Sequence, residues 1–157
     1  MWGVNPATRL AAPFLILVLT ACAPAPPPQP ATPKDETKEP WYTETVDQLA
    51  KQNRDASHLW QTGKEDQAAK LIQAGEPMAS RLLSVRNPTL AAMQAASDLD
   101  DLYGRMLFSN HNYGWARLFF QKNAARWKVW QPQTADTEAR RKEALKEIDD
   151  CDSKIAQ

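Results

Sequence analysis

The sequence predicts an all-α domain built from two helical hairpins and a C-terminal helix, and three observations carry this prediction. Beyond residue 40 the chain is rich in Ala, Leu, Gln, Glu and Lys, which are good helix formers. Apolar residues in this part recur at steps of three and four, and no alternating apolar–polar run of strand length occurs. Residues 1–40 consist instead of an apolar run followed by a proline-rich run. We therefore expect a leader over 1–21, a linker over 22–40 and the folded domain over 41–157.

The leader has the features of a secretory signal peptide. Arg9 supplies a positive charge, residues 11–19 form a short apolar run, and small residues follow it. A membrane span takes about 20 apolar residues, so this run is too short to be one. We expect the segment to be removed rather than folded.

The leader ends in Leu19-Thr20-Ala21-Cys22, which resembles the lipobox of bacterial lipoproteins. The resemblance implies that the Cys22 sulfur takes a diacylglyceryl group and that cleavage frees its amine for a further acyl chain. Two or three chains anchor a protein firmly, at about 0.8 kcal/mol per buried methylene. The alternative is a plain secreted protein with Cys22 as a spare thiol, which leaves the cysteine unexplained.

The lipobox resemblance also implies a location and a membrane partner. It places the chain in the cell envelope, held on the membrane by its lipid. An Asp after the acylated cysteine tends to retain lipoproteins in the inner membrane, whereas here the residue is Ala23. In a host with two membranes the resemblance therefore implies the outer membrane, with the domain facing the periplasm.

The linker, residues 23–40, contains seven prolines and no aliphatic residue larger than Ala. Proline fixes φ and lacks an amide donor, and charged residues keep the segment in water, so it has no means of building a core. In the polyproline II conformation, at about 3.1 Å per residue, it reaches roughly 50 Å. A PxxP ligand for another domain is the alternative.

Five helices are expected in the domain. The first ends near Gly63, the second is expected to kink or break at Gly75-Glu76-Pro77, and Asn87-Pro88 is expected to open the third. A turn at His111-Asn112 precedes the fourth, which Pro132 stops, and the fifth starts at about Thr134. Their apolar stripes include Val46, Leu49, Ala56 and Trp60; Ala68, Leu71, Ile72, Ala79 and Leu82; Ala92, Ala95, Leu99, Leu102 and Met106; Ala116, Phe119, Phe120, Trp127 and Trp130; and Ala144, Leu145, Ile148, Cys151 and Ile155.

The two hairpins align with each other when position 56 is laid on position 104. This alignment places Leu59 on Leu107 and Trp60 on Phe108, and it pairs Ala68 with Ala116 and Ile72 with Phe120. Each hairpin resembles the tetratricopeptide-repeat hairpin, in which a small residue on one helix is followed by an Ala and then a large apolar residue on the next. The second copy matches with Gly104, Ala116 and Phe120. A longer repeat, the missing Trp-Leu-Gly signature and the presence of two units depart from that family, so a TPR-like array and a small helical bundle both stay open.

The sequence contains no recognisable catalytic or metal site. The only histidines are His58 and His111, and the Asp55–His58 spacing lacks the second carboxylate–histidine pair that a di-iron bundle needs. The aspartates at 98, 100 and 101, and those at 149, 150 and 152, lack the glycine and distal glutamate of a calcium loop, and we assign them to solvated faces. We expect neither an enzyme nor a small-molecule cofactor, and the balance of 19 basic and 19 acidic residues argues against nucleic acid as a partner.

Two features bear on binding. Cys151, the thiol left once Cys22 is acylated, lies on an apolar stripe that favours burial, with an intermolecular disulfide as the alternative. The helix after residue 112 is aromatic on more than one side. Position 65 of the first hairpin is Glu where the second has Tyr113, and position 67 is Gln where the second has Trp115. We expect Tyr113 and Trp115 to face outward and to anchor another envelope protein. The alternative is a structural tether or cell-wall-associated lipoprotein without a specific binding groove.

Overall fold

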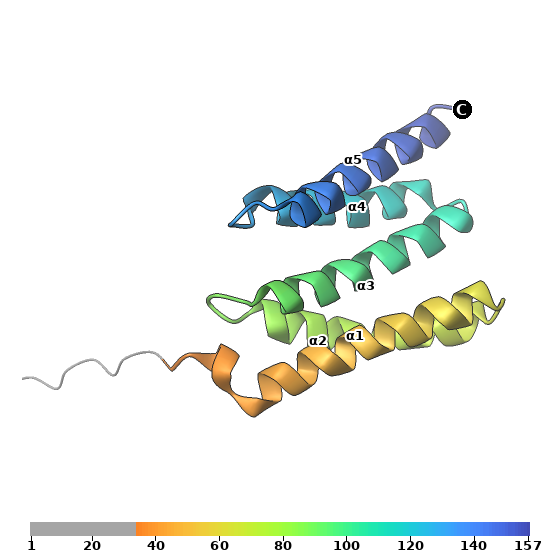
Figure 1. The fold of residues 1–157 in the computed structure, drawn as a ribbon. Helices are drawn as coiled ribbons and strands as arrows, with labels where there is room; N and C mark the ends of the chain where they lie inside the picture. Colours follow the sequence, from red (N-terminus) through yellow and green to blue (C-terminus); the bar gives the residue numbers. More distant parts are fainter. Residues whose placement is uncertain (1–33) are drawn as a thin grey trace, which may run out of the picture. The chain divides into compact units, whose positions relative to one another are not determined.

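A computed structural model describes residues 34–157, which form one compact unit. In this part of the chain the order of elements is η1 (Glu36–Lys38), α1 (Pro40–Gln61), α2 (Glu65–Leu83), α3 (Leu90–Ser109), α4 (Tyr113–Val129) and α5 (Ala135–Ile155), without strands (Figure 1). Among these residues no helix has both the length and the apolar character that a membrane crossing requires. The leader, Cys22 and Ala23 lie outside the described residues.

The helices form two antiparallel hairpins followed by a terminal helix, which confirms the predicted fold class. α1 packs on α2, α3 on α4, and α5 on α4 (Figure 1). Helix α3 is central, because it also contacts α1 and α2. The compact unit begins at Lys34, so it includes the last residues of the segment that the sequence assigns to the linker. Asp35 caps η1 by accepting a hydrogen bond from the Thr37 amide at 3.2 Å, and Pro40 occupies the first turn of α1.

Both hairpins turn through the same hydrogen-bonded motif, at positions that correspond in the alignment of the two hairpins. After α1, the Gly63 amide donates to the Trp60 carbonyl at 3.0 Å and the Lys64 amide to the Leu59 carbonyl at 2.9 Å. After α3, the His111 amide donates to the Phe108 carbonyl at 3.0 Å and the Asn112 amide to the Leu107 carbonyl at 2.8 Å. These are the two bonds of a Schellman cap, whose central residue needs the left-handed conformation. Gly63 has φ 74° and His111 has φ 61°, so both expected turns are confirmed.

The expected start of α3 is wrong, and of the kink or break expected at Gly75-Glu76-Pro77 the break does not occur. Thr89, not Asn87, caps α3, because the Thr89 hydroxyl accepts from the Ala92 amide at 3.3 Å and its own amide donates to the Tyr42 hydroxyl at 2.9 Å. The break expected near Pro77 does not occur, since α2 is continuous from Glu65 to Leu83. Gly75 is buried there, and a Cβ at this position would lie 3.0 Å from the Leu99 Cδ1. Close packing over Gly75 therefore holds α2 together, while Pro77 lies on the exposed side.

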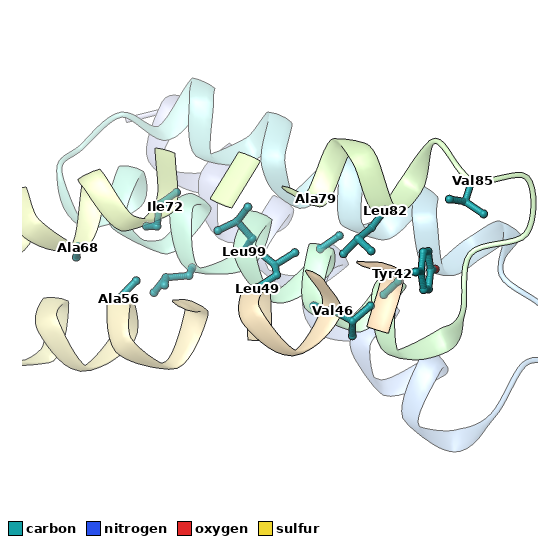
Figure 2. Close-up of a cluster of buried hydrophobic side chains, with 14 of the residues drawn as sticks. Tyr42, Val46, Leu49, Ala56, Ala68, Ile72, Ala79, Leu82, Val85 and Leu99 are labelled. Atoms are coloured by element: carbon teal, nitrogen blue, oxygen red, sulfur yellow. The ribbon is translucent and has the colours of Figure 1, made fainter. Parts of the chain in front are cut away.

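The main hydrophobic core lies between α1, α2 and α3. Figure 2 shows side chains from α1 and α2 pointing toward each other, with Leu99 of α3 among them. The expected packing residues Ala68 and Ile72 are buried in it. Its members are Tyr42, Val46, Leu49, Ala56, Ala68, Ile72, Ala79, Leu82, Val85, Ala92, Ala95, Ala96, Leu99, Leu102 and Met106.

A second, smaller core joins α4 to α5. Ala116, Phe120 and Cys151 are fully buried in it, as the apolar stripes predicted. Burial raises the pKa of the Cys151 thiol to about 11, which makes this cysteine a packing residue with little thiolate at neutral pH. The Phe120 ring lies against Gly104, where a Cβ would be only 2.7 Å from the Phe120 Cε1. The first hairpin has Ala56 and the smaller Ile72 at the corresponding positions, and both are buried.

Candidate protein-binding surface

The ionisable groups of the domain mostly hold helices together. Asp100 of α3 is buried, contrary to its expected place on a solvated face. Its carboxylate accepts from the Arg126 guanidinium at 2.7 Å and from the Lys122 ammonium at 2.8 Å, both on α4. The Trp127 indole donates to the Ser97 hydroxyl at 2.8 Å in the same contact. Burial of Asp100 is possible because two cations compensate its charge.

A second charged network joins α3 to α5. Arg105 lies 2.8 Å from both Asp101 and Glu147, and Arg140 lies 2.7 Å from Asp98. Burial raises the pKa of Asp101 and of Glu147, and the neighbouring Arg105 opposes the rise in both. These carboxylates are therefore engaged by arginines rather than free to act as acids or bases.

A shallow groove of about 550 Å³ lies beside this network, between α1 and α3. Asn53, Trp60, Asp101 and Arg105 are among its lining residues. The Asn53 amide group donates to the Ala95 carbonyl at 2.7 Å, and its own buried carbonyl oxygen has no hydrogen-bond partner within residues 34–157. Asn53 therefore links α1 to α3, but its oxygen is covered by neighbouring atoms and does not present a site to a ligand.

The histidines and the thiol do not assemble into a reactive cluster. His58 and His111 are exposed on separate helix ends, and Asp55, which the spacing paired with His58, binds Lys51 at 2.6 Å. In the part of the chain that the structure describes, no three His, Cys, Asp or Glu side chains converge as metal ligands.

The structure separates the two residues predicted to bind a partner. Tyr113 is half-buried, and its ring packs edge-on against Phe108 at 5.1 Å and His111 at 5.8 Å between centroids. Trp115 is 64% exposed. Residues two apart on a helix point to different faces, so the two side chains do not form one patch. Tyr113 supports the turn of its own hairpin, and Trp115 alone offers a free aromatic surface.

Trp115 borders a shallow cavity of about 390 Å³ at the end of the second hairpin. Tyr103 and Leu107 of α3, together with Asn112, Trp115 and Phe119, line it. The Tyr103 and Phe119 rings pack edge-on, 4.8 Å apart, and the Lys122 ammonium lies 5.8 Å from the Phe119 centroid. Aromatic residues that bury much area and a cavity that accepts a side chain are features of protein-binding surfaces.

Sequence reasoning did not identify the other exposed apolar residues of α4. Leu118 is 52% exposed and Val129 is 74% exposed. The signal that could have found them is the alignment of the two hairpins, since the first hairpin carries Lys70 and Arg81 at these positions. A Leu or Val on a helix gives a weaker signal of exposure than Trp115 does, because Leu and Val are most often buried in the core.

Comparison of the chain with protein-family models, with curated proteins and with solved structures gives no match.

Proposed function

We propose that this chain is a cell-envelope lipoprotein, anchored through Cys22, whose helical domain binds another envelope protein in a scaffold or assembly role. The observation that carries the binding proposal is the 64% exposure of Trp115 beside the cavity lined by Tyr103, Leu107 and Phe119. The first hairpin has the same turn, and it buries Ala68 and Ile72 at the positions of Ala116 and Phe120, but it has Gln67 and no aromatic residue at the position of Trp115. Folding therefore does not require Trp115, and binding gives it a role.

The proposed envelope location rests only on the sequence, through the lipobox resemblance at residues 19–22 and the identity of Ala23. With the anchor in an outer membrane, the linker sets the domain at a distance from the bilayer on the periplasmic side. The lipid is covalent, and the proposed role needs no cofactor or catalytic residue.

Metabolic labelling with a fatty acid tests the anchor. Cys22→Ala should abolish incorporation of label and leave the precursor uncleaved, because the acylated sulfur is missing. Cys151→Ala is the matched control, since it removes the other cysteine and should leave labelling unchanged. A Cys22→Ala protein that still takes up label would exclude the anchor at this residue.

Affinity purification from detergent-solubilised membranes, with mass spectrometry of what is retained, tests the binding surface. Trp115→Ala should change stability by less than about 1 kcal/mol and weaken capture of the partner, because the side chain is exposed. Phe120→Ala should cost about 3 kcal/mol or more through a core cavity. If Trp115→Ala left capture unchanged, the binding surface would lie elsewhere.

A further inference from the structure

One face of α4 carries an exposed stripe with the spacing of a helix–helix contact. Trp115, Leu118, Lys122, Ala125 and Val129 follow one another at steps of three, four, three and four, and all five are exposed. This is the spacing of alternate a and d positions in a heptad repeat, whose side chains form the contact surface for a second helix. We call these five residues the α4 seam.

The fold does not account for the α4 seam. At the corresponding positions of the first hairpin, α2 has Gln67, Lys70, Ala74, Pro77 and Arg81, which are also exposed. Thus the corresponding face is polar at three of five positions in α2, with no apolar residue larger than Pro, and apolar at four of five positions in α4, including Trp115, Leu118 and Val129. The other side of α4, with Ala116, Phe120 and Trp127, supplies what the core needs.

The dimensions of the α4 seam suit another helix. At 1.5 Å per residue, the distance from Trp115 to Val129 along the axis is about 21 Å, or nearly four turns. The cavity lined by Tyr103, Leu107 and Phe119 opens beside its Trp115 end. A helix lying along the seam would place a large apolar side chain there, as a knob enters a hole between neighbouring residues.

The charges on α4 indicate which charges a helix bound along the seam would carry. α4 contains four basic residues, Arg117, Lys122, Arg126 and Lys128, and no acidic residue. Arg117 pairs with Asp152, but Lys122 and Arg126 share the single carboxylate of Asp100. Lys128 has no ion-pair partner within residues 34–157. Two cations therefore share one paired carboxylate at the centre of the seam, where Glu76 of α2 also lines the neighbouring cavity, and the positive charge of Lys128 lies unpaired at the edge of the seam.

This charge distribution argues against a second copy of the chain as the occupant. Lys122 is the middle residue of the seam, so a symmetric pairing of two seams, parallel or antiparallel, would bring two Lys122 ammonium groups together. Like charges facing each other across a helix pair destabilise it. A helix from another protein with carboxylates opposite Lys122 and Lys128 meets no such penalty.

We propose that the partner binds through an amphipathic α-helix that packs along the α4 seam, with acidic side chains opposite Lys122 and Lys128 and one large apolar side chain in the cavity beside Trp115. This inference rests on the proposed function, because it names the chemistry of the segment that the envelope partner contributes. It extends the binding surface from Trp115 to Leu118 and Val129.

Site-specific photo-crosslinking in cells that express the full chain tests the proposal. A benzophenone amino acid replaces Leu118 or Val129 in separate variants, and a third variant carries it at Trp115. Lys70 and Arg81 are the matched controls, because they occupy the same two positions on α2 and are also exposed. Leu118 and Val129 are more than half exposed, so their replacement leaves the fold intact. Mass spectrometry then identifies the cross-linked segment.

The expected result is that positions 118 and 129 cross-link to one segment of one protein, with apolar residues at three- and four-residue steps and Asp or Glu beside them. Lys128→Glu should lower the yield by about fivefold, because it replaces a charge attraction with a repulsion between carboxylates. Equal yields at positions 70 and 81, or a segment without that pattern, would overturn the proposal.

The remaining outcomes separate this inference from the proposed function. Adducts at position 115 alone would keep a protein partner and exclude the helix along the seam. Adducts to lipid would assign the seam to a membrane surface, and adducts to the same chain would assign it to a dimer. Absence of adducts at positions 115, 118 and 129 would overturn this inference and the protein-binding part of the proposed function, whereas the anchor at Cys22 is decided by the labelling experiment.

Discussion

His111 occupies a backbone conformation that favours glycine, and this makes the second hairpin turn a site of local strain. Its φ of 61° lies in the left-handed region, where a residue with a Cβ is disfavoured by about 1 kcal/mol or more relative to glycine. The first hairpin has Gly63 at the same position of the same cap. The His111 ring makes one edge-on contact, with Tyr113, which offsets little of this cost.

We therefore expect His111→Gly to raise the free energy of unfolding by about 0.5–1 kcal/mol, and Gly63→Ala to lower it by about 1 kcal/mol. Urea unfolding followed by circular dichroism measures both. Opposite signs for the two substitutions are the signature of a shared left-handed cap. A loss of stability in His111→Gly would mean that the ring contact, and not the backbone, decides the energy at this turn.

The environment of Glu147 predicts how the stability of the domain changes with pH. Burial raises the pKa of this carboxyl in the folded state, with Arg105 opposing the rise. The folded chain therefore binds a proton here more readily than the unfolded chain does. The resulting stability is fully present below the unfolded pKa and is lost as the pH rises through the folded pKa. Glu147→Gln removes that proton binding.

The wild type should consequently gain stability relative to Glu147→Gln as the pH is lowered from about 7 to below the ordinary glutamate pKa of about 4.3. Urea unfolding of both proteins across this range checks the difference. Asp101→Asn should show the same direction, because burial raises the pKa of Asp101 as well. If either variant instead became more stable relative to the wild type at low pH, the pairing with Arg105 would outweigh the effect of burial on the pKa of the carboxyl.

Comparison of the two hairpins in the sequence could find Trp115 but could not separate it from Tyr113. Both positions are polar in the first hairpin, so the alignment predicts exposure for each. Tyr113 is half-buried because its ring packs on Phe108, whose counterpart Trp60 has no such neighbour at Glu65. An aromatic pair that forms within one hairpin is a tertiary contact, and a pattern of residue types does not reveal it.

At the scale of the helices, the packing of α3 on α4 depends on the pairing of Gly104 with Phe120. A methyl group at position 104 would meet the ring at 2.7 Å, so the glycine makes room for the larger side chain. The first hairpin solves the same packing with Ala56 and Ile72. In the first hairpin an alanine faces the smaller isoleucine. In the second hairpin a glycine, which has no Cβ, faces the larger phenylalanine.

A double-mutant cycle tests whether the two solutions are interchangeable. Gly104→Ala alone should cost about 1–3 kcal/mol through overpacking. Phe120→Ile alone should also destabilise, because it leaves a void. The double variant should be more stable than the sum of the two changes by about 1 kcal/mol or more, as measured by thermal or urea unfolding. Strict additivity would mean that the ring moves aside and that the pair is not coupled.

The boundaries of the helices show what local signals predict and where packing overrides them. Gly63, Thr134 and the turn at His111-Asn112 act through hydrogen bonds within a few residues, and each lies where the sequence places it. Pro77 gives an equally strong local signal for a break, yet α2 continues through it. Gly75 is held between α1 and α3, and no property of residues 75–77 alone shows that the neighbouring helices are that close.

At the scale of the whole molecule, the helical periodicity predicts the two hairpins and the terminal helix, but not which polar residues are buried between them. The run of aspartates at positions 98, 100 and 101 predicts a solvated face for Asp100. Asp100 is buried because α4 brings Lys122 and Arg126 next to it. These two residues are 22 and 26 positions further along the sequence. The exposure of the α4 seam is unpredictable from helical periodicity alone for a related reason, because the exposed side of a helix is the side that the neighbouring helices leave uncovered.

The division of the core into two parts predicts unequal local stability across the domain. The larger cluster joins α1, α2 and α3, whereas the smaller cluster of α4 and α5 consists of Ala116, Phe120 and Cys151, with Leu107, Phe108 and Ile148 packed against it. Trp127 and Ala144 are buried on the same side of the domain, outside that cluster. Regions with less buried apolar contact open at lower free energy than the main core. Charged contacts on this side, such as Arg117–Asp152, are open to solvent, which screens them, so they add little to its stability.

Native-state hydrogen exchange of residues 34–157 should therefore show the slowest amides in α1 and α3 and faster exchange in α5. The α4 amides should lie between them, because the Asp100 network ties α4 to α3. Arg126→Ala should shift α4 toward the rate of α5, since it leaves the buried Asp100 carboxylate with Lys122 alone. The matched control is Lys128→Ala, on the exposed side of the same turn, which should leave all rates unchanged. Equal rates in all five helices would show that the domain opens only as a whole, and that the smaller core is as strongly coupled to α3 as α1 and α2 are.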